Sequence, residues 1–318
     1  RSSKLENHIL LLFSRSSFGK PINVLFPEFD GRLSLVCQSP EAENICRKCD
    51  LVFLALPHTA SMKLAVKLAK KRIRIIDLSA DYRIKDPKVY AKFYSVKHVD
   101  LGGLKRAVYG LPELNREKIK NAALVANPGC YPTAAILALA PLAYVKGMDL
   151  SSVIIDAKSG VSGAGKKIAE SFLFSEANED FKAYKVGVHQ HAPEINQELS
   201  KMSKRKVEAL FVPHLLPLNR GILETIYVRR NRRGTGISLI DLYAKFYKKE
   251  PFVRVRKDGD MPRLKDVVHT NFCDIGVKDL GKNIVLVSAI DNLLKGASGQ
   301  AVQNMNIMCG FPERQGLL

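Results

Sequence analysis

The sequence predicts an α/β protein in which a doubly wound parallel sheet is followed by a second, α+β domain. Three observations support this prediction. Apolar runs typical of buried strands alternate with helical periodicity up to about residue 126. Beyond that point the strand-like runs have longer connections, with few helices between them. A length of 318 residues also gives room for two domains of roughly 100–200 residues each.

Short apolar runs mark the predicted strands of the first half. Asp50–Leu56 is the strongest and stops at Pro57. Thr59–Lys71 then carries apolar residues at helical spacing, with Thr59 as its predicted N-cap. Because a helix separates strands, we expect them to pair in parallel. The other predicted strands are His8–Phe13, Leu33–Cys37, Ile73–Leu78 and Ala122–Ala126.

The second half has more widely spaced strands, which predicts a more antiparallel sheet. Ser238–Lys248 is its clearest helix. The closing segment Gly296–Met308 has an apolar face at helical spacing, and we expect it to pack back onto the first domain. The predicted strands are Val153–Ala157, Val207–Val212, Ile222–Val228, Val253–Arg256 and Ile284–Ile290.

Composition excludes several classes of protein. Fifty Lys and Arg residues against 31 Asp and Glu residues give a formal charge of +19. The basic residues are scattered without an aromatic-interleaved stripe, so we interpret them as a solvated surface and predict no nucleic-acid partner. No run reaches the ~20 apolar residues of a membrane span, and the first residues lack a signal-peptide pattern. We therefore expect a cytoplasmic enzyme without a membrane partner.

The six cysteines are dispersed, unlike those of a disulfide-stapled domain. Cys46 and Cys49 form one CxxC pair, but no second Cys or His pair stands at ligand spacing. We interpret these two as small apolar residues near a helix end and predict no metal site.

The start of the chain lacks an element that a doubly wound nucleotide-binding domain normally has. Such a domain opens with a strand, a glycine-rich turn and a helix, whereas no G-x-G-x-x-G precedes His8 here. Because the chain begins at Arg1 without an initiating Met, we interpret the sequence as incomplete at its N-terminus. A naturally truncated and catalytically silent protein is the alternative.

The loop after the first predicted strand indicates the cofactor. NAD enzymes place an acid at this point to bind the ribose 2′-hydroxyl, whereas a 2′-phosphate calls for arginine. This chain has Ser14, Arg15, Ser16 and Ser17, and no acid. The pattern favours NADP, with an ordinary polar surface loop as the alternative.

Cys130 is the leading candidate for a catalytic residue. It lies in NPGCYPT, between the predicted strand Ala122–Ala126 and an apolar helical run. Pro132 near the first helical position places Cys130 at the helix N-terminus, where the dipole and free N–H groups favour a thiolate. Such positions lower a cysteine pKa to roughly 3.5–7.5. A nucleophile and a buried structural cysteine are the two interpretations.

Two further segments suit acyl chemistry. Lys158–Lys167, KSGVSGAGKK, offers a glycine-rich backbone for close ligand approach, or forms a mobile surface turn. His189, His191 and Glu194 lie within six residues. No third ligand accompanies the histidines, so we favour an acid/base for a cysteine nucleophile over a metal pair.

These segments resemble the N-acetyl-gamma-glutamyl-phosphate reductase family of arginine biosynthesis, which is related to the aspartate-semialdehyde dehydrogenases. The resemblance extends from about Ser14 to Leu318. It implies a Rossmann-type NADP domain, without its first strand and glycine-rich loop, and an α+β catalytic domain. The matching strings are SRSSFGKP, FLALPH, DLSADYRIKDP, VYGLPELNR, NPGCYPTA, DAKSGVSGAG, HQHAPEI, PHLLPLNRGI, NFCDIG and AIDNLLKGASGQAVQNMN.

The resemblance implies a reaction and its residues. Cys130 would attack the acyl phosphate and expel phosphate, and NADPH would reduce the thioester to N-acetylglutamate semialdehyde. His189 matches the family's acid/base. Arg83 resembles the phosphate-binding arginine, which a bidentate guanidinium suits. The other implied residues are Asn127, His191, Glu194 and Arg220 for substrate, and Ser14, Arg15, Ser17, Pro57, Ser159, Gly160 and Asn292 for cofactor.

The resemblance also implies domains and partners. Residues 1–129 and 293–318 would form the NADP-binding domain, and residues 130–292 the catalytic and oligomerisation domain. A small acyl-phosphate substrate and a dimer or tetramer of the chain are expected. A sister group reduces carrier-linked aminoadipate or glutamyl phosphate and tends to carry GAGCNATA. This chain has NPGCYPTA instead, which favours the free acyl phosphate and leaves the carrier-linked substrate as the alternative.

Overall fold

The computed structural model describes residues 11–14, 16–165, 173–230 and 238–318. The predicted cofactor residue Arg15 lies outside these residues, as do residues 8–10 of the first predicted strand. No helix in the described ranges is long and apolar enough to cross a membrane.

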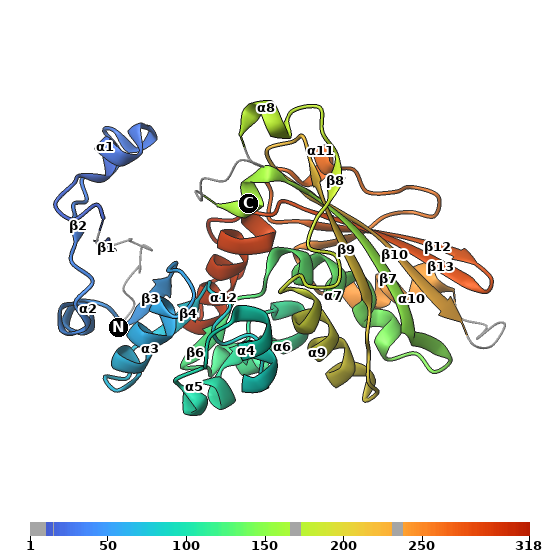
Figure 1. Ribbon diagram of the computed structural model, residues 1–318, viewed down its shortest axis with the longest axis horizontal. Helices are drawn as coiled ribbons and strands as arrows, with labels where there is room; N and C mark the ends of the chain where they lie inside the picture. Colours follow the sequence, from blue (N-terminus) through green and yellow to red (C-terminus); the bar gives the residue numbers. More distant parts are fainter. Residues whose placement is uncertain (1–10, 15, 166–172, 231–237) are drawn as a thin grey trace.

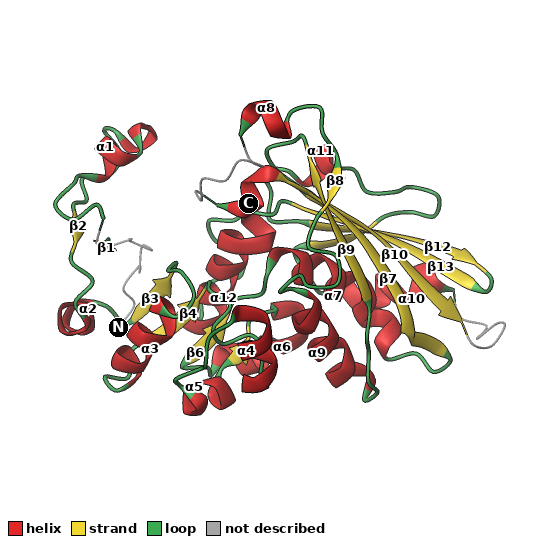
Figure 2. Ribbon diagram, viewed as in Figure 1, coloured by secondary structure: helices red, strands yellow, loops and turns green. Residues whose placement is uncertain are grey.

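Most of the first half folds into the expected doubly wound unit (Figures 1 and 2). Its described residues form a four-stranded parallel sheet in the order β3-β4-β6-β5. The three longest of these strands confirm predicted ones, each somewhat shorter than expected. The bounds are β3 (Leu51–Leu54), α3 (Ala60–Ala69), β4 (Arg74–Asp77), α4 (Pro87–Tyr94), α5 (Leu101–Arg106), β5 (Val108–Tyr109), α6 (Pro112–Lys120) and β6 (Leu124–Ala126).

The segment before β3 lies at the left of Figure 1, and its helix α2 (Ala42–Lys48) packs on the doubly wound unit, because Ile45 shares a core cluster with Leu54 and Met62. Its two short strands pair in parallel with each other. The predicted strand Leu33–Cys37 is largely wrong, because the observed strand begins only at Cys37. The bounds are β1 (Leu12–Phe13), α1 (Ile22–Leu25), η1 (Pro27–Phe29), β2 (Cys37–Gln38) and α2 (Ala42–Lys48).

The helix α3 begins where predicted, but a different side chain caps it. Thr59 is the N-cap residue with a φ of +70°, and its own side chain makes no capping bond. The carboxylate of Asp81 instead accepts hydrogen bonds from the backbone N–H groups of Thr59, at 2.9 Å, and Met62, at 3.0 Å. A cap from a neighbouring loop cannot be deduced from local sequence.

The second half contains a seven-stranded sheet in the order β11-β12-β13-β10-β7-β9-β8. Within the described residues, four of its six strand pairings are antiparallel, which confirms the prediction of a more antiparallel sheet in this half. One long strand, β12, was not predicted. The bounds are β7 (Met148–Gly160), β8 (Lys182–Ala183), β9 (Leu210–Leu216), β10 (Ile222–Arg230), β11 (Val253–Val255), β12 (Cys273–Leu280) and β13 (Asn283–Ile290).

The helix α7 (Cys130–Ala143) is the centre of the molecule, and every residue after Cys130 in it is buried. Pro141 lacks an N–H, which leaves the carbonyl of Leu137 without its helical donor. The hydroxyl of Tyr247 donates to that carbonyl, and Tyr243 donates to Ala138 O at 2.6 Å. Both tyrosines come from α10 (Leu239–Tyr247), which confirms the predicted helix Ser238–Lys248. The other bounds are η2 (Val161–Ala164), α8 (Phe174–Ala177), α9 (Ala192–Ser203) and α11 (Leu264–Val267).

The C-terminal segment packs back onto the first unit, as predicted. Its helix α12 (Gly299–Cys309) contributes Ala301 and Ile307 to a core cluster with Ile76 and Ile119. The helix was predicted to begin at Gly296, but η4 (Leu294–Ser298) is a π-helix and the α-helix begins only at Gly299. This segment thereby lies beside the N-terminal end of α7, where the candidate site is found.

Candidate active site

The turn before α7 places Cys130 as the sequence predicts. β6 ends at Ala126, and Gly129 is the N-cap of α7, so Cys130 is its first residue. The N–H of Thr133 donates to Gly129 O at 2.9 Å, and the hydroxyl of Thr133 donates to the same oxygen at 2.9 Å. The cysteine is thus fixed at a helix N-terminus and at the carboxyl end of a parallel strand, where open α/β sheets bind ligands.

Cys130 opens into a cavity of about 190 Å³. Five of the predicted site residues line it together: Arg83, Asn127, Cys130, His191 and Asn292. They come from widely separated parts of the chain, so the fold brings the predicted residues into one place. Gly163 and Gly296 also line the cavity.

Arg83 is buried, and most of its guanidinium is engaged by the backbone. Its Nε donates to Asn127 O at 2.7 Å, and its Nη2 donates to Leu78 O at 2.7 Å. Its Nη1 lies 3.6 Å from Glu194 Oε2. Two of its three nitrogens therefore each donate to a backbone carbonyl, and the phosphate contact expected for Arg83 stays a prediction. Burial is the largest single effect and lowers the pKa of Arg83, but Glu194, Tyr94, Tyr109 and Asp77 together raise it above the usual value, so the guanidinium stays charged.

Glu194 holds the catalytic turn rather than lining the cavity. It is fully buried, and its Oε1 accepts the N–H of Gly129 at 2.9 Å and the hydroxyl of Tyr109 at 2.8 Å. Burial raises its pKa despite the opposing effects of Arg83 and these two donors. Glu194 therefore supports the turn before Cys130 and does not line the cavity, and its contact with substrate stays a prediction.

The two histidines differ in position. His191 lines the Cys130 cavity, and its Nδ1 is buried without a hydrogen-bond partner among the residues that the structure describes. His189 lines a second cavity of about 510 Å³, and its Nδ1 accepts the backbone N–H of His191 at 3.1 Å. The ring centroids are 4.9 Å apart. Burial, followed by Lys185, lowers the pKa of His189 to about 4, and burial lowers that of His191 well below its usual range. Both rings are neutral near pH 7.

The thiol of Cys130 departs from the expected low pKa. Burial raises its pKa to about 11, although the N–H of Tyr131 and the charge of Arg83 act in the opposite direction. The prediction from the helix N-terminus alone is therefore wrong for the free chain. The thiol needs a base to become a nucleophile, and the neutral His191 lines the same cavity, whereas His189 lines the other one.

The glycine-rich segment after β7 has a structural explanation. A Cβ on Gly160 would lie 2.6 Å from the backbone oxygen of Asn219, so the turn between β9 and β10 requires glycine here. Asn292 ties the same region together, since its Oδ1 accepts the N–H of Gly221 at 2.7 Å. Its Nδ2 donates to Ser162 Oγ at 3.0 Å. Ser159 is buried near this junction.

The other predicted site residues that the structure describes do not line the Cys130 cavity. Arg220 pairs with Asp291, with 3.3 Å between Nη1 and Oδ2. Pro57 is exposed just after β3. Ser14 follows β1, and its Oγ accepts the N–H of Ser17 at 3.1 Å. Sequence reasoning missed Gly296 as a cavity residue, although the string KGASGQ was already part of the resemblance.

Comparison with known proteins agrees with this arrangement. Residues 2–122 match the family model described as the NAD binding domain of semialdehyde dehydrogenase, and residues 130–292 match the model of its dimerisation domain. N-acetyl-gamma-glutamyl-phosphate reductase of Geobacter metallireducens is 49% identical over 97% of this chain and 90% of its own length. The protein of the same name from Citrifermentans bemidjiense is 50% identical over 96% of this chain and 88% of its own.

Solved structures show the same fold at low identity. Aspartate semialdehyde dehydrogenase II from Vibrio cholerae has a TM-score of 0.71 with 18% identity, over 94% of this chain and 89% of its own. Aspartate semialdehyde dehydrogenase with NADP from Candida albicans has a TM-score of 0.65 with 13% identity, over 93% of this chain and 89% of its own.

Proposed function

The chain belongs to the N-acetyl-gamma-glutamyl-phosphate reductase family, and from this membership we propose how its residues reduce N-acetyl-gamma-glutamyl phosphate with NADPH to N-acetylglutamate semialdehyde. The observation that carries the proposal is the shared cavity of Cys130, Arg83, Asn127 and His191 at the start of α7. A thiol, an arginine and the neutral imidazole of His191 in one small cavity suit acyl transfer from a phosphate leaving group.

The first step transfers the acyl group to Cys130. A base takes the thiol proton, the sulfur bonds to the acyl carbon, and the bond from that carbon to the phosphate oxygen breaks with its electron pair. Phosphate leaves, and a thioester remains. The charged Arg83, the Asn127 turn and the free N–H groups at the start of α7 would stabilise the developing negative charge.

The proposed acid/base is His189, supported by its low pKa and its place beside His191. His191 shares the cavity with Cys130, so it would relay or directly receive the proton. Bound NADPH supplies the hydride that reduces the thioester. When the resulting thiohemiacetal collapses, the carbon–sulfur bond breaks, the aldehyde leaves, and the histidine pair returns the proton to the thiol.

For the cofactor, we propose that Asn292 and the Ser159–Gly160 backbone border the nicotinamide, because Asn292 lines the same cavity as Cys130. Pro57 lies just after β3, at a carboxyl strand end. Ser14, Arg15 and Ser17 would meet the 2′-phosphate, since the loop has a cation and no acid. Arg220 is proposed for a substrate carboxylate.

We propose that residues 1–129 and 293–318 form the NADP-binding domain and residues 130–292 the catalytic one, because α12 packs on the first sheet.

A homodimer through the outer face of the seven-stranded sheet is proposed as the assembly. Leu210, Ile154, Tyr227 and Val285 lie in register across four neighbouring strands on that face. Leu210 is 53% exposed and Tyr227 42% exposed, which is unusual for neighbouring apolar side chains in the middle of a sheet.

The direct test of the proposal is substitution of the nucleophile. Cys130→Ser is expected to abolish acyl-phosphate-dependent oxidation of NADPH, because a hydroxyl is a far weaker nucleophile than a thiol. Cys309→Ser, at the end of α12, is the matched control and should keep its activity. Turnover of C130S at the wild-type rate would contradict the assignment.

A further inference from the structure

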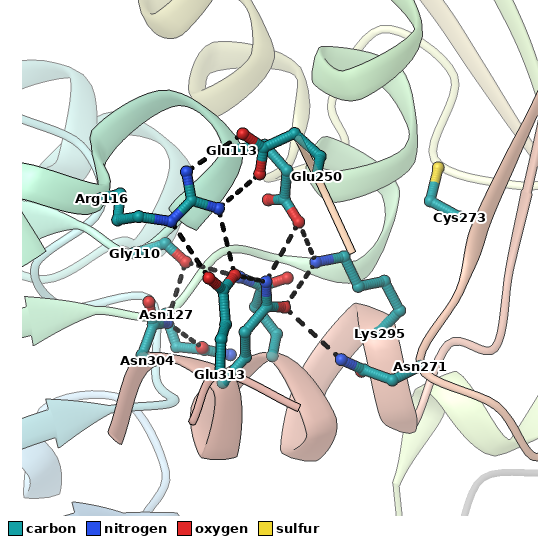
Figure 3. Close-up of polar contacts among 12 residues, drawn as sticks. Gly110, Glu113, Arg116, Asn127, Glu250, Asn271, Cys273, Lys295, Asn304 and Glu313 are labelled. Carbon is teal, nitrogen blue, oxygen red and sulfur yellow. Dashed lines mark hydrogen bonds and ion pairs between the residues drawn. The ribbon is translucent and has the colours of Figure 1, made fainter. Parts of the chain in front are cut away.

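Lys295 is a buried lysine that the proposed mechanism does not use. Its side chain has no exposed surface. Its Nζ lies 2.6 Å from Glu113 Oε1 and 2.7 Å from Gln303 Oε1. A buried charge persists in a fold only when it is paired and hydrogen-bonded, so these contacts fix the lysine in one place. Figure 3 shows it at the meeting point of α6 and the C-terminal segment.

The pair belongs to a larger polar network (Figure 3). Gln303 Nε2 donates to Glu113 Oε1 at 3.2 Å and to Glu313 Oε1 at 2.8 Å. Arg116 of α6 pairs with Glu250, at 2.5 Å, and with Glu313, at 3.1 Å. The network therefore joins α6, α12 and the turn before β11 into one unit around Lys295.

The residue after Lys295 touches the catalytic cysteine. A Cβ on Gly296 would lie 2.8 Å from the Cβ of Cys130 and 3.2 Å from its Cα. Real Cβ atoms do not approach so closely, so only glycine allows this contact. The next residue, Ala297, accepts a hydrogen bond from Asn127 Nδ2 at 3.0 Å. Both residues line the Cys130 cavity.

The local backbone explains how this contact is made. The N–H of Gly296 bonds to Asp291 O at 2.9 Å, and that of Ser298 bonds to Leu293 O at 2.9 Å. Both bonds span five residues, which makes η4 a π-helical turn wider than an α-helical one. Such turns are rare and are frequently found at functional sites. The widened turn lets one residue point into the network while its neighbour lies against Cys130.

We propose that Lys295 is a positioning residue for the reaction. Its buried pair with Glu113 fixes the π-turn. The fixed turn holds Gly296 against Cys130 and thereby sets the place of the sulfur relative to the acyl phosphate. Lys295 touches neither substrate nor cofactor and acts through Gly296. This inference rests on the proposed role of Cys130 as the nucleophile.

The test is the double variant Glu113→Gln with Lys295→Met. Removing both charges leaves no unpaired buried ion, and Met keeps most of the volume of Lys, so the variant should unfold near the wild-type temperature. We expect kcat to fall about ten- to a hundredfold because the sulfur is misplaced, while KM for the acyl phosphate changes little. The rate of Cys130 alkylation by iodoacetamide, followed by mass spectrometry of its peptide, should also change.

A matched control removes an exposed ion pair of the same kind. Lys278 Nζ lies 3.3 Å from Asp258 Oδ1, and both side chains are exposed. The variant K278M/D258N should keep the wild-type kcat and alkylation rate. If the buried double variant does not fold, E113D decides, because it keeps both charges but shortens the side chain that holds Lys295, and it should lower kcat by a smaller factor.

The outcomes separate this inference from the proposed function. Wild-type kcat and alkylation in the folded E113Q/K295M chain would overturn the positioning role, and C130S would remain inactive. The same result in E113D would overturn it where the double variant fails to fold. Turnover by C130S would instead overturn the nucleophile assignment.

Discussion

At Cys130, two effects of the fold act on one thiol in opposite directions. The start of α7 and the charge of Arg83 favour the thiolate, whereas burial favours the neutral thiol and raises the pKa to about 11. Burial prevails in the free chain. The thiol is therefore protonated near pH 7, so the proposed acyl transfer needs a base, and the neutral His191 lines the same cavity.

This balance predicts the pH dependence of Cys130 alkylation in the chain without substrate. Because a protonated thiol does not react, the alkylation rate should rise about tenfold per pH unit from pH 7 and level off near the pKa of about 11. The rate constant is measured with iodoacetamide and peptide mass spectrometry. A plateau already reached near pH 7 would show that the helix N-terminus prevails over burial.

The sequence predicts the site residues that carry chemistry better than those that support them. Cys130, Arg83, Asn127, His191 and Asn292 are predicted and share one cavity. Their types and local strings are recognisable without the fold. The need for glycine at position 296 cannot be predicted in this way, because it comes from a contact with Cys130, which is distant in sequence. The hydrogen bonds of Arg83 cannot be predicted either, because its Nε and Nη2 donate to backbone carbonyls that only the fold brings near.

At the scale of elements, apolar runs predict most long strands, and β12 shows where this fails. Gly276 and Asp274 interrupt its apolar pattern. A Cβ on Gly276 would lie 2.7 Å from Met261 Sδ, so the packed loop requires glycine inside the strand. Asp274 is buried in an ion pair with Arg254, at 2.5 Å. Both exceptions come from tertiary contacts that a local pattern cannot contain.

The junction between α9 and α7 gives a prediction about Glu194. Glu194→Ala removes the acceptor for Gly129 N–H and leaves Arg83 without its buried partner. We expect a loss of about 3–5 kcal/mol in the free energy of unfolding, together with a lower kcat. Glu194→Gln keeps an oxygen acceptor for Gly129, so it should lower the free energy of unfolding and kcat by less than Glu194→Ala. Urea denaturation and steady-state kinetics measure the two effects, and an unchanged E194A would contradict the role given to this carboxylate.

At the scale of the whole molecule, the seven-stranded sheet has one face against α7 and α10 and an apolar row on the other. A dimer that buries this row predicts that Tyr227→Lys, which would place like charges opposite each other, yields monomers. Val99→Lys, at a residue 63% exposed on the first domain, should stay assembled. Light scattering after size exclusion measures the mass, and an unchanged assembly of Y227K would exclude this face as the interface.

The central claim is that Cys130 carries the acyl group during the reaction. The most direct measurement is to mix the protein with N-acetyl-gamma-glutamyl phosphate in the absence of NADPH, stop the reaction with acid, and analyse the peptides by mass spectrometry. The claim predicts one N-acetylglutamyl group on the Cys130 peptide, one phosphate released per acylated chain, and loss of the group when NADPH is added. Phosphate release with an unmodified Cys130 peptide, or acylation of another residue, would contradict it.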